Sequence, residues 1–187
     1  MKSGLMVPGR QAEILGLVGA AWGLAGLTGL LVFAVYRLAD VVVAGIEWPW
    51  AWQHVAVAGV NAAFMAWSEG WRGFQRSFSP RVAARLKWLR DHPSIGRVAF
   101  APLFAMGYFG ATRERLIGIY CLTGGIVVLI VFVHLLPQPW RAALDIGVVL
   151  GLTWGVVSTL VCAWRALGSE TYHVEPGIPG DVVIGRS

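Results

Sequence analysis

Two histidines near the ends of apolar stretches are the first residues in this sequence that could perform chemistry. His54 lies about one helical turn inside the second apolar stretch, and His134 lies three residues before Pro137 at the end of the third. Two imidazoles on facing helices could ligate a b-type haem or a copper ion. The alternative is that each histidine forms ordinary hydrogen bonds near a helix end. One hypothesis is therefore a cofactor site formed by these two histidines, with haem b as the candidate cofactor.

A stripe of polar residues runs through the same second stretch. His54, Asn61 and Ser68 are spaced by seven and share a helix face, and Glu69 and Arg72 follow at one end, where they could form an ion pair. Polar side chains are costly inside a membrane, so we expect the stripe to face other helices. It would form interhelical hydrogen bonds or, in a homo-oligomer, line the path of a small channel or transporter.

No motif that organises catalysis is found. The sequence contains no Gly-rich phosphate loop, HExxH, nucleophile elbow, Asp-rich metal motif or CxxC. We therefore assign no catalytic residue and no motif-based metal site. A lipid-acting enzyme that lacks a familiar motif stays open as an alternative.

The composition sets the class of protein that must hold these residues. The chain has 187 residues, of which 57% are hydrophobic and 13% charged, whereas a soluble domain carries about 25% charged residues. A compact soluble domain of this size leaves roughly 30% of its unfolded surface in water, which so few charges could not cover. The composition excludes an ordinary soluble globule and predicts an all-α integral membrane protein.

Four apolar stretches reach the roughly 20 residues that a helix needs to cross a bilayer. They predict one four-helix transmembrane domain over residues 1–167, a cytoplasmic interfacial loop over 69–115 and a polar tail over 168–187. The segment from Val98 to Thr112 is too short to span and is expected to be re-entrant or interfacial. The predicted spans are 14–36, 48–68, 116–136 and 146–164.

The charges and tryptophans orient the predicted spans. Nine basic residues lie between Glu69 and Arg115, and the positive-inside rule places this loop and both termini in the cytoplasm of a bacterial-type inner membrane. A basic loop between apolar spans favours anionic lipid over nucleic acid. Eight tryptophans fall at the expected interfaces, namely Trp48, Trp50, Trp52, Trp67, Trp71, Trp88, Trp140 and Trp164. Near the outer ends, Arg37 with Asp40 and Arg141 with Asp145 have the spacing of structural ion pairs.

A basic amphipathic helix is predicted within the loop. Ser79 and Pro80 suit its start, and Val82, Leu86 and Leu89 would form its apolar face. Such a helix is typical of the headgroup plane of a membrane. The residues expected to contact lipid headgroups are Arg81, Arg85, Lys87, Trp88 and Arg90.

Glycines are arranged in lines at helical spacing. Small residues let two helices approach closely in a membrane, so the lines predict packing within one bundle or contact with another chain, and the fourth span has the longest line. The lines are Gly16, Gly19, Gly23 and Gly26 in the first span, Gly118, Cys121 and Gly125 in the third, and Gly147, Gly151, Gly155 and Thr159 in the fourth.

These observations favour a non-catalytic accessory subunit of a larger membrane complex, which packs through its glycine faces against other subunits or further copies of itself. The alternatives are a haem- or metal-binding electron-transfer protein that uses His54 and His134, and a homo-oligomeric channel or transporter lined by the polar stripe.

Overall fold

The computed structural model describes residues 9–169 and 171–178, and within these ranges every regular element is a helix. Three helices are long and apolar enough to cross a membrane, which fits an integral membrane protein. They are α1 (Gly9–Ile46), α6 (Arg113–His134) and α7 (Trp140–Gly168). An all-helical structure is therefore confirmed. Predicted spans 14–36 and 146–164 lie within α1 and α7, and the predicted span 116–136 extends two residues past the end of α6.

Helix α1 is longer than the span predicted within it. The apolar stretch was expected to end at Tyr36 because Arg37 follows, yet the helix continues to Ile46 and has 38 residues. The added turns pack on α7, where Gly45 lies directly against Ala142. Arg37 and Asp40 therefore lie within the C-terminal part of a long helix and not beyond its end.

The fourth predicted span lies in a helix with an irregular centre. Helix α2 (Trp52–Met65) passes into the π-helix η1 (Ala66–Phe78) and then into α3 (Ser79–Asp91), with helical dihedral angles at both junctions. In the π-helical part the backbone N–H of Ser79 bonds the carbonyl oxygen of Phe74, five residues back. The regular helix α2 has only 14 residues, so it is not among the three helices that reach spanning length. The predicted amphipathic helix continues this element, and Ser79 does not cap it.

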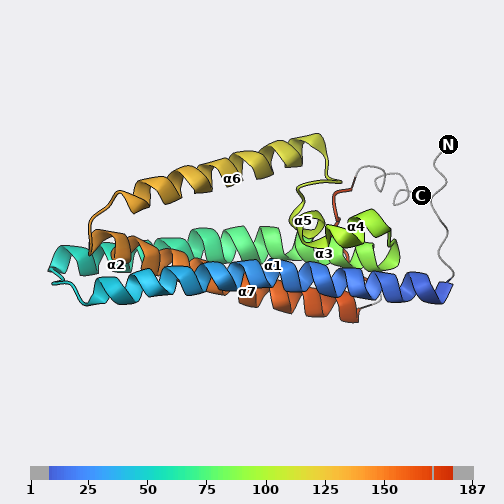
Figure 1. Cartoon of the computed structure of the whole chain (residues 1–187), viewed down its shortest axis with the longest axis horizontal. Helices are drawn as coiled ribbons and strands as arrows, with labels where there is room; N and C mark the ends of the chain where they lie inside the picture. Colours follow the sequence, from blue (N-terminus) through green and yellow to red (C-terminus); the bar gives the residue numbers. More distant parts are fainter. Residues whose placement is uncertain (1–8, 170, 179–187) are drawn as a thin grey trace.

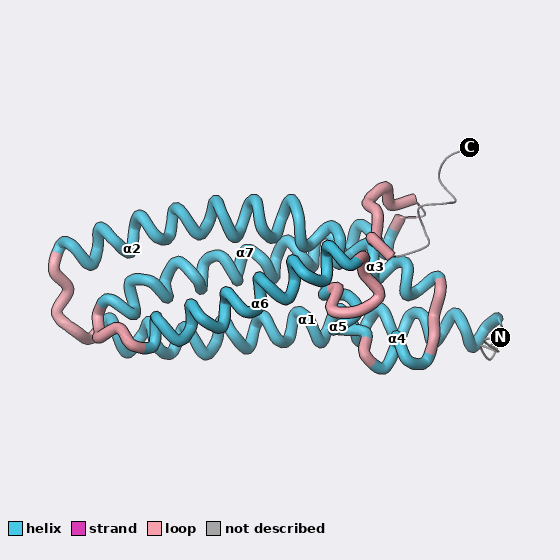
Figure 2. Tube along the Cα trace, turned by 90° about the horizontal axis from the view of Figure 1, so that it is seen from above, coloured by secondary structure: helices cyan, strands magenta, loops and turns pink. Residues whose placement is uncertain are grey.

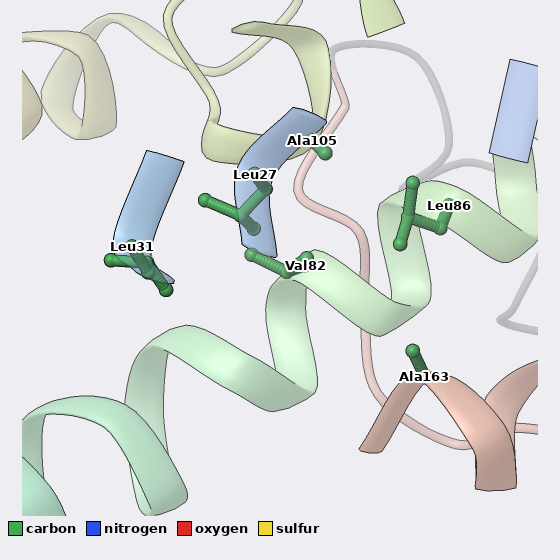
Figure 3. Close-up of a cluster of buried hydrophobic side chains, with 6 residues drawn as sticks. All are labelled: Leu27, Leu31, Val82, Leu86, Ala105 and Ala163. Atoms are coloured by element: carbon green, nitrogen blue, oxygen red, sulfur yellow. The ribbon is translucent and has the colours of Figure 1, made fainter. Parts of the chain in front are cut away.

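Three long elements lie side by side, and Figure 2 shows α7 between α1 and α2. Helix α3 contacts both α1 and α7. Helix α1 runs antiparallel to α7, because Gly45 meets Ala142 at one end while Leu27 and Ala163 share a cluster nearer the other. Figure 3 shows that cluster, in which apolar side chains of α1, α3, α5 and α7 meet. The bundle core therefore lies toward the end where α3 packs.

The segment expected to be re-entrant or interfacial folds against this end of the bundle. It forms α4 (Ile95–Ala99) and α5 (Ala101–Met106), and α5 packs on α1 and α3. Phe104 is fully buried. Helix α5 ends at Gly107, whose φ of 90° is readily available only to glycine. The segment closes the core instead of standing alone at the membrane surface.

Helix α6 stands apart from the other long helices, as Figure 1 shows. None of its residues is buried, and its few helix contacts are made mainly with α7. Polar contacts hold its middle and its C-terminal end: Tyr108 Oη lies 2.8 Å from Thr123 Oγ1, and Arg141 Nη2 lies 3.1 Å from His134 Nε2. The stretch between these contacts is an apolar helix without protein cover from this chain.

Part of the C-terminal tail packs on the bundle. The sequence predicted a tail without structure of its own unless a partner ordered it, and residues 171–178 are indeed non-helical. However, Ile178 is buried with Leu89 and Phe104. The chain itself therefore supplies a surface for this part of the tail. Residue 170 and residues 179–187 of the predicted tail lie outside the described residues, as does Lys2 of the charge argument.

Candidate functional site

The polar stripe of the second predicted span is split between the bundle and the surface. Asn61 donates hydrogen bonds from Nδ2 to the carbonyl oxygens of Ala143 and Leu144, at 3.4 and 2.8 Å. Ser68 bonds its own helix at the Phe64 carbonyl. Glu69 and Arg72 are exposed, and the expected ion pair between them is absent from the described residues. Instead, the Arg72 guanidinium lies 5.1 Å from the centre of the Trp67 ring.

The π-helix explains why the seven-residue spacing fails beyond Met65. A π-helix repeats over more residues per turn than an α-helix, so the face toward α7 recurs at wider spacing. Gly70, Phe74 and then Ser79 meet α7, and the β-carbon of Glu69 also lies beside Gly151 of α7. Spacing in the sequence assumes a regular helix, and it therefore does not account for Arg72, which is exposed beside Trp67.

A buried cluster of three hydroxyls joins α3 to α7. Ser79 Oγ lies 2.9 Å from Ser158 Oγ and 3.0 Å from Thr159 Oγ1, and all three residues are buried. Within residues 9–169 and 171–178, the hydrogen bonds between side chains at these oxygens join only the three hydroxyls, so the cluster links α3 to α7. From the sequence, Thr159 was singled out as the extension of a glycine line and Ser79 as a helix cap, but Ser158 was not singled out.

The two histidines lie on either side of the first turn of α7. The His54 ring packs edge-on against Trp140, with 4.4 Å between ring centres. Its Nδ1 accepts the backbone N–H of Ala51 at the start of α2. His134 has Nδ1 at 3.0 Å from the Ile130 carbonyl and Nε2 at 3.1 Å from Arg141.

This geometry does not favour a haem or copper site. Both ring nitrogens of His134 are engaged in hydrogen bonds, and a metal at Nε2 would face the Arg141 guanidinium. Among the described residues no group of three or more histidine, cysteine or acidic side chains is placed to hold a metal ion. The two imidazoles instead secure the start of α2 and the end of α6 to α7.

One of the two expected outer ion pairs is confirmed. Arg141 Nε lies 3.7 Å from Asp145 Oδ2, and Asp145 is only 3% exposed. This distance is too long for a hydrogen bond. Arg37 and Asp40 are exposed and form no ion pair within the described part of the chain.

The glycine lines of α1 and α7 are filled by other helices of the same chain. Gly16 lies directly against the Arg90 backbone, Gly147 against the Asn61 side chain, and Gly155 against the Phe74 ring. The fourth-span line, which the sequence favoured for contact with a partner, is thus occupied by α2 and η1. By contrast, Gly118 and Gly125 on α6 have open space around them.

Arg85 is the most buried cation among the described residues, although the sequence predicted that it contacts lipid headgroups. It is 3% exposed and donates to four backbone carbonyls. Its Nε bonds Phe104, Nη1 bonds Pro176, and Nη2 bonds Phe109 and Gly110. Burial, with the nearby Arg115 charge, lowers the pKa of Arg85 to about 10, so it stays cationic at neutral pH. Arg85 therefore ties α5, the following loop and the tail to α3.

The neighbouring predicted headgroup residues also make contacts within the chain. Lys87 donates to the Ser169 carbonyl, and Arg90 donates to the Leu167 carbonyl and to Asp91. The Trp88 ring stacks on His92. Arg81 donates to Ser77 Oγ. These contacts give the basic face of α3 a role in the fold, and an additional contact with lipid stays a prediction.

Comparison of the chain with protein-family models, curated proteins and solved structures gave no match. Its function is therefore argued from its own residues.

Proposed function

We propose that the protein is a non-catalytic subunit of a larger integral membrane assembly and that α6 is the helix that its partner covers. The observation that carries this proposal is the contrast between a three-element bundle with filled glycine faces and a 22-residue apolar helix without one buried residue. Lipid alone could surround α6. However, Gly118 and Gly125 each lie about one turn from Cys121, on one side of α6, and such small residues suit close helix contact.

In this proposal the chain crosses an inner membrane four times with both termini in the cytoplasm. The α2–η1 helix supplies the fourth crossing, since it lies beside α7 over most of its length. The positive-inside distribution of arginine supports the orientation. Exposed cations near the cytoplasmic end, such as Arg97, Arg113 and Arg165, would meet anionic headgroups.

The experiment compares a tagged wild-type chain with two variants after extraction in a mild detergent. In the double variant Gly118→Leu with Gly125→Leu, bulky side chains occupy the open face of α6. The matched control is Gly59→Leu, at an exposed glycine of α2 that also has open space around it.

The native mass and the co-purifying proteins are measured by mass spectrometry. We expect wild type and the control to migrate in a larger complex, and the α6 variant to be released from it while it stays folded. Equal native masses for all three proteins would show that α6 does not hold a partner.

A further inference from the structure

An exposed stripe on α1 carries two opposite charges. Phe33, Tyr36, Arg37, Asp40 and Val43 are all exposed and recur every three or four residues, so they share one face of the helix. Gly29, one turn before Phe33, has open space around it. We call these six residues the α1 stripe. None of the neighbouring helices covers it.

The contacts at the outer end of the bundle give the depth of these charges. Gly45 of α1 lies against Ala142, and His134 of α6 contacts Arg141, the residue before Ala142. Gly45 and His134 are therefore level with each other. At about 1.5 Å per residue, Asp40 and Arg37 lie about 7.5 and 12 Å inward from this level.

At the same distances inward from His134, α6 exposes only apolar side chains. Five and eight residues before His134 are Leu129 and Ile126, which are about half exposed. Since such a surface belongs in hydrocarbon, Arg37 and Asp40 lie at the depth of the hydrocarbon core. Charged side chains at that depth nearly always pair with one another or face a protein interior.

The two charges do not satisfy each other within one chain, because the described residues contain no ion pair between them. Their arrangement is nevertheless self-complementary. Copies inserted with the same orientation are related by a twofold axis along the membrane normal, so two α1 helices would lie parallel and at the same depth. Arg37 of each copy then stands one helical turn or less from Asp40 of the other.

We propose that a second copy of this chain covers the α1 stripe, with Arg37 of each copy paired to Asp40 of its partner. Gly29 allows close approach of the two helices near one end, and Phe33, Tyr36 and Val43 supply apolar contact on both sides of the paired charges. The inference rests on the membrane insertion of α1 and is independent of the accessory role proposed for α6.

The test measures energy transfer between donor- and acceptor-labelled copies of the full chain in phosphatidylcholine vesicles, over a range of protein-to-lipid ratios. The variants Arg37→Asp and Asp40→Arg each place like charges opposite one another. We expect each to need about tenfold more protein per lipid for the same transfer, because two symmetry-related polar contacts are lost together. The control is Glu13→Arg, at an exposed position of α1 far from the stripe, and it should match wild type.

The decisive arm mixes the two variants. A copy with Arg37→Asp and a copy with Asp40→Arg are complementary at every facing position, so the mixture should regain transfer at wild-type ratios. Recovery supports the pairing and shows that both variants insert and fold. The absence of transfer for wild type above random proximity, unchanged transfer in both single variants, or no recovery in the mixture would each overturn the proposal.

The neutral variants Arg37→Gln and Asp40→Asn serve as a second measure should a charge reversal prevent insertion. Each should weaken association about threefold, since a polar contact in the membrane contributes modestly. Unchanged association in both would also overturn the proposal. The α6 variants should leave energy transfer intact, so failure of the accessory role is distinguishable from failure of this pairing.

Discussion

The three-element bundle and α6 are built from similar residues but have opposite surroundings. Helices α1 and α7 bury their glycine faces, and α7 alone buries ten residues. Helix α6 is as apolar and carries glycines at helical spacing, yet it buries nothing. A line of glycines therefore indicates a helix face that is able to pack. Whether another helix of the same chain covers that face depends on the rest of the fold.

Two arginines, one in the bundle and one on α6, also differ in how deeply they are buried. Arg85 of α3 and Arg115 of α6 lie on either side of the tail, because Arg85 bonds the Pro176 carbonyl while the Arg115 guanidinium lies directly against Gly177. Arg85 is buried with four carbonyl partners, whereas Arg115 is half-buried. The bundle arginine is therefore a structural centre, and its counterpart on α6 is a more peripheral contact.

The largest effect is expected from Arg85→Met. The change leaves four buried or partly buried carbonyls without their donor, and buried groups that lose a partner cost about 1–3 kcal/mol each, with incomplete addition. We expect the unfolding free energy to fall by about 3 kcal/mol or more. The measurement is the thermal midpoint in detergent, together with protease sensitivity of the tail.

Arg115→Met is the matched change on α6. It should lower the midpoint far less, because Arg115 is partly solvated. Similar losses for both variants would contradict the view of Arg85 as the structural centre of this end.

A medium effect is expected from Gly16→Ala in α1. The new methyl group would overlap the Arg90 backbone, which cannot rotate away as a side chain can. Overpacking of this kind costs about 1–3 kcal/mol. Gly118→Ala on α6 meets open space, and the better helix propensity of alanine should leave stability equal or raise it by up to about 1 kcal/mol. Thermal midpoints measured side by side test the pair, and equal destabilisation would remove the distinction between the two regions.

The smallest effect is expected from Ser79→Ala. This change removes hydroxyl contacts with Ser158 and Thr159 between α3 and α7, and interhelical polar contacts in membranes contribute about 0.6 kcal/mol on average. We expect a loss of about 1 kcal/mol in the unfolding free energy. Thr123→Ala on α6 removes one contact with Tyr108 and should change stability by less than about 0.5 kcal/mol. A larger loss for Thr123→Ala, measured by reversible denaturation, would show that α6 is more tightly held than its exposure indicates.

Much of the architecture was predictable because it depends on the length and hydropathy of each stretch of the chain. Three of the predicted spans correspond to helices of spanning length, since length and hydropathy are properties of each stretch alone. The Arg141–Asp145 pair was predictable for a similar reason, as both residues lie one turn apart on the same helix.

The candidate site was less predictable because its contacts join distant parts of the chain. The buried state of Arg85 depends on carbonyls 19 to 91 residues away, and nothing near Arg85 distinguishes it from the exposed Arg97. Likewise, the π-helix shifts the face that follows Met65, so Arg72 does not lie in the predicted interior stripe.

The sequence alone predicts helices that are long and apolar enough to cross a membrane, because too few charges are available to cover a soluble surface and the apolar stretches match the thickness of a bilayer. Only the tertiary structure shows which glycine faces are filled and which arginine is buried. The physical reason is that a helix carries its own periodicity and length but not its alignment with neighbouring helices, and that alignment is set by packing across the bundle.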